Sequence, residues 1–133
     1  MEEEELTEKI IGCAMKVHSV LGPGFLESIY AKALAHELRE AGLKVECEKP
    51  ITVKYSGVVV GEFSADKLVE EKVIVEEKAV QALAPAHEVQ LVNYLTATGI
   101  EIGLLLNFGA PRLEYKHKSR TYRQTQRAKD FIL

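Results

Sequence analysis

Residues 66–78 read Asp-Lys-Leu-Val-Glu-Glu-Lys-Val-Ile-Val-Glu-Glu-Lys, and the rest of the chain is best interpreted outward from them. Two apolar segments flank three consecutive charged residues at 70–72, a pattern typical of two strands joined by a short loop. Closing the loop there sets Asp66 directly opposite Glu76, with both side chains on one face of the sheet. Lys78 follows two residues later and shares that face. The register therefore predicts two carboxylates and one amine side by side.

Opposed carboxylates repel each other, so stability alone does not favour this arrangement. A hard cation such as Mg²⁺ between them would make it reasonable, because such ions prefer oxygen ligands and keep several waters. A neighbouring lysine could then orient or deprotonate a metal-bound water, or stabilise charge developing on a phosphate. Spacing alone leaves open the alternative of a solvated, charged hairpin, since Glu70, Glu71, Lys72 and Glu77 lie in the same stretch.

The bulk composition is that of an ordinary globular protein. With 133 residues, 47% hydrophobic and 28% charged, the chain is expected to form a single domain over residues 1–133 with one core. A net charge of -3 excludes a protein that coats nucleic acid by bulk charge alone. The charge is lopsided, however: residues 2–5 are all Glu, whereas residues 112–129 hold seven Lys or Arg against one Glu. That basic stretch offers phosphate contacts at Lys116, Lys118 and Arg120, or else a solubilising surface strand.

Nothing in the sequence indicates a secreted or membrane protein. The N-terminus is acidic, unlike a signal or transit peptide, and no apolar run approaches the roughly 20 residues of a membrane span. Cys13 and Cys47 stand alone and are interpreted as small buried hydrophobes rather than disulfide or zinc ligands. A cytoplasmic location is expected.

Hydrophobic periodicity predicts an α/β (α+β-like) protein with a mixed β-sheet flanked by helices. Thr7 is the expected cap of the first helix, Pro50 is expected to interrupt the first strand, and Ser56-Gly57 has the composition of a hairpin turn. The expected helices cover residues 7–21, 25–41 and 86–98. The expected strands cover residues 44–49, 51–55, 58–69, 73–75, 102–108 and 112–118.

Three motifs in this order resemble a known family. Asp66 followed by Glu-Glu-Lys at 76–78 is similar to the Asp…Glu-x-Lys signature of the PD-(D/E)XK nuclease superfamily. Residues 24–30, Gly-Phe-Leu-Glu-Ser-Ile-Tyr, read as G-x-x-E-x-x-Y, the motif of the GxxExxY proteins, a branch of that superfamily. Residues 90–94, Gln-Leu-Val-Asn-Tyr, resemble the Q-x-x-x-Y helix motif of RecB-like members. The first pattern alone is weak, but the three together, within a similarity over about residues 7–108, are specific.

The resemblance implies a restriction-endonuclease-like core of helix, three-stranded antiparallel sheet, helix and strand. It implies a Mg²⁺ or Mn²⁺ site with Asp66, Glu76 and the main-chain carbonyl of Glu77 as ligands. Glu27 resembles the helix glutamate that many members direct at the metal, through water or without it. Lys78 would be the catalytic lysine, and Gln90 would support the metal–water network.

Two tyrosines complete the implied site. Tyr94 would contact the phosphate or pack beneath the site, and Tyr30 would pack in the core with its hydroxyl available to a carboxylate or to substrate. Lys67 and Glu77 depart from the family, because both positions are usually apolar. Strand alternation directs them to the face opposite the site, and their charge leaves open how completely a helix covers that face.

The sequence thus favours a divalent-metal-dependent nuclease that hydrolyses phosphodiester bonds of DNA or RNA. The alternative is a non-catalytic module that binds nucleic acid or protein and retains the nuclease fold. A homodimer is a further expectation, with residues 102–108 and 131–133 as apolar contact segments.

Overall fold

The structure is a computed structural model, described here for residues 1–120 of the chain. None of its helices in this range has the length and apolar character required to cross a membrane. The helices are α1 (Glu3–Leu21), α2 (Glu27–Glu40) and α3 (Pro85–Thr98). The strands are β1 (Val45–Tyr55), β2 (Val58–Val69), β3 (Val73–Lys78), β4 (Ile102–Asn107) and β5 (Glu114–Ser119).

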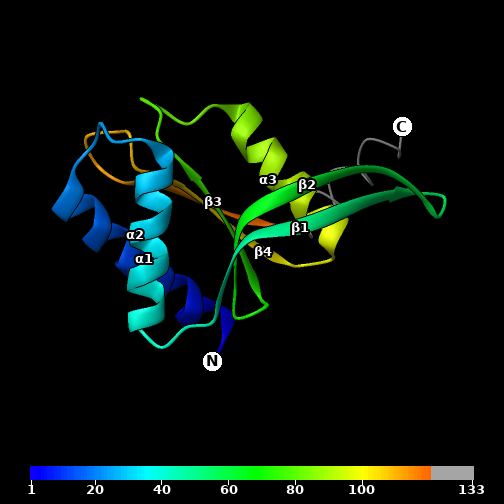
Figure 1. The fold of residues 1–133 in the computed structure, drawn as a ribbon, viewed down its shortest axis with the longest axis horizontal. Coiled ribbons are helices and arrows are strands. Elements are labelled where there is room, and N and C mark those ends of the chain that lie inside the picture. The colour runs from blue at the N-terminus through cyan, green and yellow to red at the C-terminus, as the bar shows by residue number, and fades with distance from the viewer. Residues whose placement is uncertain (121–133) are drawn as a thin grey trace, which may run out of the picture.

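The five strands form one mixed sheet in the order β1-β2-β3-β4-β5. β3 and β4 pair in parallel, and every other neighbouring pair is antiparallel. Parallel neighbours need a crossover connection, and α3 provides it. α1 and α2 cover one face of the sheet, α3 lies on the other, and the β1–β2 hairpin projects beyond the body (Figure 1). The predicted class, a mixed β-sheet flanked by helices, is confirmed, as is the expected order of helix, three-stranded antiparallel sheet, helix and strand.

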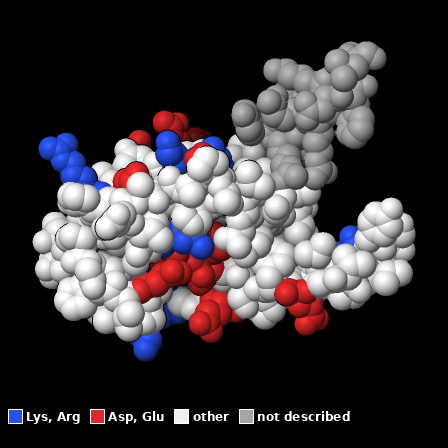
Figure 2. Space-filling view, turned by 90° about the horizontal axis from the view of Figure 1, so that it is seen from above, with Lys and Arg blue, Asp and Glu red and all other residues white. Residues whose placement is uncertain are grey.

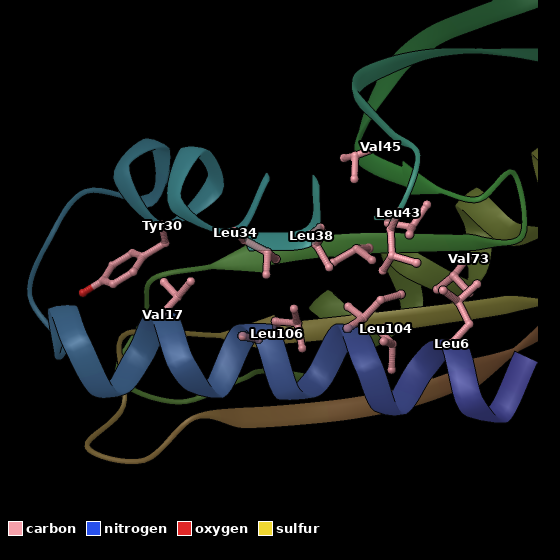
Figure 3. Packing of buried hydrophobic residues seen from close by; sticks show 14 of the residues in the cluster. Leu6, Val17, Tyr30, Leu34, Leu38, Leu43, Val45, Val73, Leu104 and Leu106 are labelled. Atoms are coloured by element: carbon pink, nitrogen blue, oxygen red, sulfur yellow. The ribbon is translucent and has the colours of Figure 1, made fainter. Parts of the chain in front are cut away.

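The core is divided by the sheet into two clusters. Leu104 and Leu106 of β4 point into the cluster formed with α1 and α2 (Figure 3), whereas Leu105 points into the cluster formed with α3. All three side chains are 0% exposed. The expectation that residues 102–108 provide a dimer contact is therefore wrong, because this strand is central and covered on both faces. The other expected contact segment, residues 131–133, lies outside the described residues.

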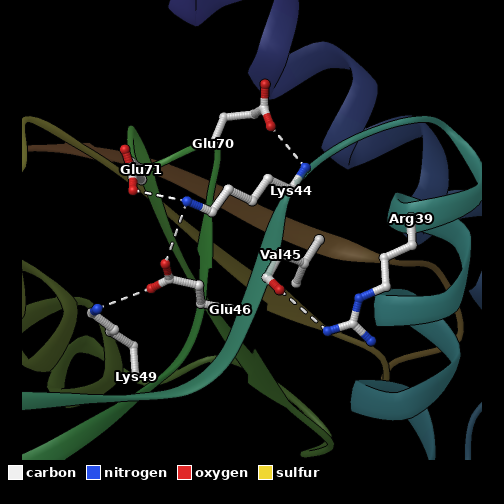
Figure 4. A network of polar contacts seen from close by, with 7 residues as sticks. All are labelled: Arg39, Lys44, Val45, Glu46, Lys49, Glu70 and Glu71. Atoms are coloured by element: carbon white, nitrogen blue, oxygen red, sulfur yellow. Dashed lines mark hydrogen bonds and ion pairs between the residues drawn. The ribbon is translucent and has the colours of Figure 1, made fainter.

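The β2–β3 hairpin has the register that the sequence predicts, with Val69 opposite Val73 and Leu68 opposite Ile74. Its turn places Glu70 at φ 53° and Glu71 at φ 57°, a left-handed conformation that non-glycine residues rarely adopt. A polar network fastens this turn to the start of β1 (Figure 4). Lys44 donates from its backbone N–H to Glu70 and from its ammonium to Glu71, at 2.7 and 2.9 Å.

The β1–β2 ladder changes face halfway along. Val45 belongs to the α1–α2 cluster and Ile51 to the α3 cluster, although strict alternation would place residues six apart on one face. The change occurs at Glu48, which has φ 50° and, like the facing Asp66, is missing from the ladder. Asp66 therefore lies where the sheet is locally irregular, which frees its backbone and side chain for other contacts.

Three local predictions are corrected. α1 begins at Glu3, so Thr7 is not its cap but a buried residue whose hydroxyl donates to the Glu4 carbonyl; acidic residues suit the first turn, which extends the helix upstream. Pro50 does not interrupt β1, since β1 is an edge strand on which a missing N–H is tolerated. Cys47 is exposed rather than buried, because it lies on that same edge strand.

Candidate functional site

The centre of the site is the end of the β2–β3 ladder, where carboxylates take the place of backbone partners. The main-chain pairing ends at Lys67 and Val75. Beyond it, the Asp66 N–H donates to Glu76 Oε2 over 2.6 Å, and the Glu77 N–H donates to Asp66 Oδ2 over 2.8 Å. Each carboxylate thus fixes the opposite strand with one oxygen and leaves its second oxygen for another ligand.

The carboxylates destabilise one another's charged forms. Burial, and next the charge of Asp66, raise the pKa of Glu76 to about 8. Burial and the charge of Asp66 also raise the pKa of Glu27, which lies at the start of α2. Seen from the side on which α2 and α3 begin, carboxylates gather in a hollow next to basic groups (Figure 2). Such a concentration of negative charge calls for a cation.

The donor set fits Mg²⁺ or Mn²⁺ only if backbone and water ligands contribute. Within residues 1–120, no group of three or more His, Cys, Asp or Glu side chains is arranged to hold a metal ion by itself. Mg²⁺ in proteins is commonly bound through one or two carboxylates and keeps several waters. The second oxygens of Asp66 and Glu76, with a main-chain carbonyl beside them, match that requirement.

Lys78 and Gln90 meet at the edge of this centre. Lys78 ends β3, is half-buried, and places its ammonium 3.5 Å from Gln90 Oε1 on α3. The first turn of α3 is fixed by His87, whose Nδ1 accepts a hydrogen bond from the Ala84 N–H over 3.0 Å. The position of Gln90 in the second turn therefore follows from how α3 begins.

Tyr30 does not line the site, and the expectation that it contacts substrate is wrong. Its side chain is 0% exposed and stacks on Phe108, with ring centroids 4.9 Å apart. Its hydroxyl donates to the Gly22 carbonyl and accepts the Phe25 N–H over 3.1 Å, so it serves the loop rather than a carboxylate. Tyr30 thereby holds residues 22–25, the loop in front of α2, and Glu27 is the first residue of that helix.

Tyr94 lies close to the carboxylates, but its ring packs against a side chain of β2. Its ring stacks on Phe63 with centroids 3.9 Å apart. Burial, followed by the charges of Glu76 and Asp66, raises the pKa of its hydroxyl. Of the two roles expected for Tyr94, packing beneath the site agrees better with this position.

The basic residues of β5 are largely engaged with carboxylates. Lys118 forms an ion pair with Glu88 at 2.5 Å, and Arg120 forms one with Glu101 at 2.5 Å. Lys116 is exposed on the same strand. β5 is also two strands away from the β2–β3 junction. These three residues are therefore not brought together with Asp66 and Glu76.

Two features near the site were not anticipated from the sequence. Lys67 and Glu77 form an ion pair whose side chains are 1% exposed, so the face they occupy is well covered. Burial raises the pKa of Glu77 to about 7 even though the Lys67 ammonium opposes the shift. The signal was present as two charges on facing strands, but charge alone does not distinguish a buried pair from a solvated one.

The second unanticipated feature is Asn107 at the end of β4, which is 0% exposed. Its side chain accepts the Val80 N–H over 3.0 Å and donates to the Val80 carbonyl over 2.9 Å. It thereby fixes the segment that leaves β3 directly after Lys78. Gly109 touches the same segment, where an added Cβ would meet the Val80 carbonyl oxygen at 2.4 Å.

The sequence matches a known protein family over most of its length. A family model described as the PD-(D/E)XK nuclease superfamily matches residues 4–119. The chain belongs to this superfamily. The match covers all five strands and all three helices except the first residue of α1, and it includes every candidate site residue except Arg120. Members of the PD-(D/E)XK superfamily typically use divalent metal ions and act on nucleic acids.

Solved structures support the fold of this PD-(D/E)XK chain. The crystal structure of SSO0001 matches with a TM-score of 0.56 and 20% identity, over 70% of this chain and 50% of that one. An alkaline exonuclease, LHK-Exo from Laribacter hongkongensis, matches with a TM-score of 0.52 and 14% identity, over 77% and 59%. The chain thus spans half the length of the first protein and 59% of the second. No curated protein matches it significantly in sequence.

Proposed function

We propose that this chain is a Mg²⁺- or Mn²⁺-dependent nuclease that hydrolyses phosphodiester bonds of DNA or RNA, and that it is a GxxExxY member of its superfamily. The observation that carries the proposal is the junction of β2 and β3. Asp66 and Glu76 hold each other's strands there with one oxygen each, and Lys78 follows on the same strand as Glu76. The branch assignment rests on the motif at 24–30 and on the way Tyr30 holds the loop before Glu27.

In this proposal Asp66, Glu76 and the Glu77 carbonyl hold the metal, and Glu27 adds a ligand directly or through water. When bound, the cation supplies a Lewis acid that activates water and neutralises charge on the phosphate. The Lys78 ammonium orients the attacking water or donates to a phosphate oxygen as negative charge develops. Gln90 Oε1 lies 3.5 Å from that ammonium and limits its orientations.

Calorimetric titration of Mn²⁺ in metal-free buffer tests the metal site. Wild type is expected to bind, whereas Asp66→Ala combined with Glu76→Ala is expected not to. If both proteins give the same heats, the carboxylates are only a charged hairpin and the proposal fails.

Cleavage of labelled DNA and RNA then tests catalysis. Lys78→Ala should bind Mn²⁺ as wild type does and lose cleavage. Lys72→Ala is the matched control, because it removes the same charge from the turn at the other end of the hairpin, where the Lys72 ammonium donates to the Met1 carbonyl. Equal activity of the two variants would remove Lys78 from the mechanism.

One observation favours a non-catalytic module as the second candidate. Asp66 and Glu76 each accept a backbone N–H of the facing strand, so both carboxylates have a structural role that needs no metal. This candidate predicts nucleic-acid binding that needs no divalent metal and weakens steeply with salt. Affinity for nucleic acid that needs no metal, together with the absence of cleavage, would support the non-catalytic module.

A further inference from the structure

A cavity of about 820 Å³ runs along α2 and opens onto the candidate metal site. One wall is the exposed side of α2 from Glu27 to Arg39, which spans about 18 Å at 1.5 Å per residue. The opposite wall comes from β1, and from β2 and β3, which carry Asp66 and Glu77. We call this cavity the α2 groove. It shares Glu27 and Asp66 with the candidate site, so an occupant of the groove reaches the proposed metal ligands.

Between Glu27 and Glu40, the helix wall of the α2 groove carries small and basic side chains. Ser28, Ala31 and Ala35 leave room for an occupant to approach the helix backbone closely. Lys32 and His36 stand one turn apart on the same side, are exposed, and make no hydrogen bond or ion pair within the described part of the chain.

Arg39 continues the row at the far end of the helix. Its Nη2 donates to the Val45 carbonyl over 3.2 Å, which fixes the guanidinium against β1 (Figure 4). A row of three basic side chains, two of them unpaired, is suited to successive phosphates.

The floor of the groove holds an acceptor that lacks a donor. Glu77 is 0% exposed and lines the groove; one carboxylate oxygen pairs with Lys67, and the other, Oε1, has no hydrogen-bond partner. Buried polar atoms are normally satisfied, so this oxygen indicates an internal water beneath the floor of the groove rather than a contact of the occupant. Of the remaining lining carboxylates, Glu40 follows Arg39 at the end of α2, and Glu48 lies on β1 opposite Asp66.

We propose that the α2 groove binds a single nucleic-acid strand that leads away from the metal site, with its phosphates along Lys32, His36 and Arg39. The inference rests on the nuclease function proposed above and names the form of its substrate. A single strand is preferred over a duplex because the basic side chains stand in one row on one helix, which offers contacts to the phosphates of one backbone.

The experiment measures binding by fluorescence anisotropy in the full chain, with Lys78→Ala as background to prevent cleavage and Mn²⁺ present. The probes are a labelled 12-nucleotide DNA strand, the RNA of the same sequence and the corresponding blunt DNA duplex. Lys32→Ala with His36→Ala is compared with Lys9→Ala, an exposed position on α1. Both variants remove one formal charge when His is neutral, so the bulk charge effect is matched.

We expect the groove variant to bind the single strands at least fivefold more weakly and to show a shallower salt dependence. The control should change affinity less than twofold, and the duplex should bind more weakly than either strand.

The two proposals fail in different ways. Suppose that the Lys78→Ala background protein binds Mn²⁺ and the single strands, but that the groove variant binds them as Lys9→Ala does. The α2 groove is then not the strand path, and the nuclease assignment stands. Tighter binding of the duplex than of the strands overturns the groove inference in the same way. If neither Mn²⁺ nor any probe binds, the nuclease proposal itself is refuted and the groove inference with it.

Discussion

Replacing Tyr30 by Phe deletes only a hydroxyl, yet the structure predicts a measurable loss of stability. The hydroxyl donates to the Gly22 carbonyl and accepts the Phe25 N–H, while the ring stacking on Phe108 survives the change. Each lost hydrogen bond is worth about 0.5–1.5 kcal/mol. The two together should lower the free energy of unfolding by about 1–3 kcal/mol. With about 2.1 cal/mol/K of unfolding entropy per residue, this lowers the melting temperature by roughly 4–11 °C.

Tyr94→Phe is the matched control, because Tyr94 is also stacked on a phenylalanine. Its hydroxyl makes no hydrogen bond within residues 1–120, so the free energy of unfolding should change by less than about 0.5 kcal/mol. Urea denaturation followed by circular dichroism measures both variants at one pH. If the two differ by less than about 0.5 kcal/mol, Tyr30 does not hold the loop before α2, and the explanation of the G-x-x-E-x-x-Y motif is refuted.

Three further predictions concern the sheet and its surroundings. The folded-state pKa of Glu76 is about 8, whereas its ordinary value is 4.5. The metal-free folded protein therefore retains a proton that the unfolded chain releases. The contribution of this proton to the free energy of unfolding is complete below pH 4.5 and is lost as the pH rises to 8. In EDTA the melting temperature of wild type should therefore fall more steeply over this window than that of Glu76→Gln, and parallel curves would contradict the assignment. At pH 8, Lys67→Met should cost on the order of 3 kcal/mol by leaving Glu77 unpaired, and adding Glu77→Leu should recover most of it in urea denaturation; a double variant as unstable as the single would show no coupling. Gly109→Ala should destabilise by about 1–3 kcal/mol because its Cβ meets backbone, while Gly12→Ala, with open space inside α1, should stabilise by about 0.5–1 kcal/mol; equal unfolding midpoints would be inconsistent with this packing.

The β2–β3 hairpin could be predicted because the residues that determine its register lie close together in the sequence. Alternation and a three-residue charged loop are enough to set the register of β2 against β3, and that register places Asp66 beside Glu76. The core position of Tyr30 was predicted and is confirmed, but its contacts were not, because its stacking partner Phe108 is 78 residues away in the chain and periodicity carries no record of such contacts. Its motif was visible, but the carbonyl and N–H that its hydroxyl serves were not.

The buried Lys67–Glu77 pair was missed for a different reason. Alternation correctly separates it from Asp66 and Glu76, but whether a charged pair is covered depends on how α2 lies over the sheet. The face change at Glu48 was invisible for the same cause: a single left-handed residue reverses the alternation, and Glu is not a residue whose presence predicts it.

The order in which these contacts form during folding follows from the one parallel pair of strands. β1, β2 and β3 are joined by short turns, so their ladders close over small chain separations, whereas β4 reaches β3 only after residues 79–101 have crossed over. Closing a long segment before its contacts stabilise it is slow. Asp66 and Glu76 can therefore meet early, while Gln90 arrives beside Lys78 only with the crossover. A chain halted between these stages would carry the carboxylates without Gln90 beside Lys78, so the proposed hydrolytic activity should be the last property that the nascent molecule acquires.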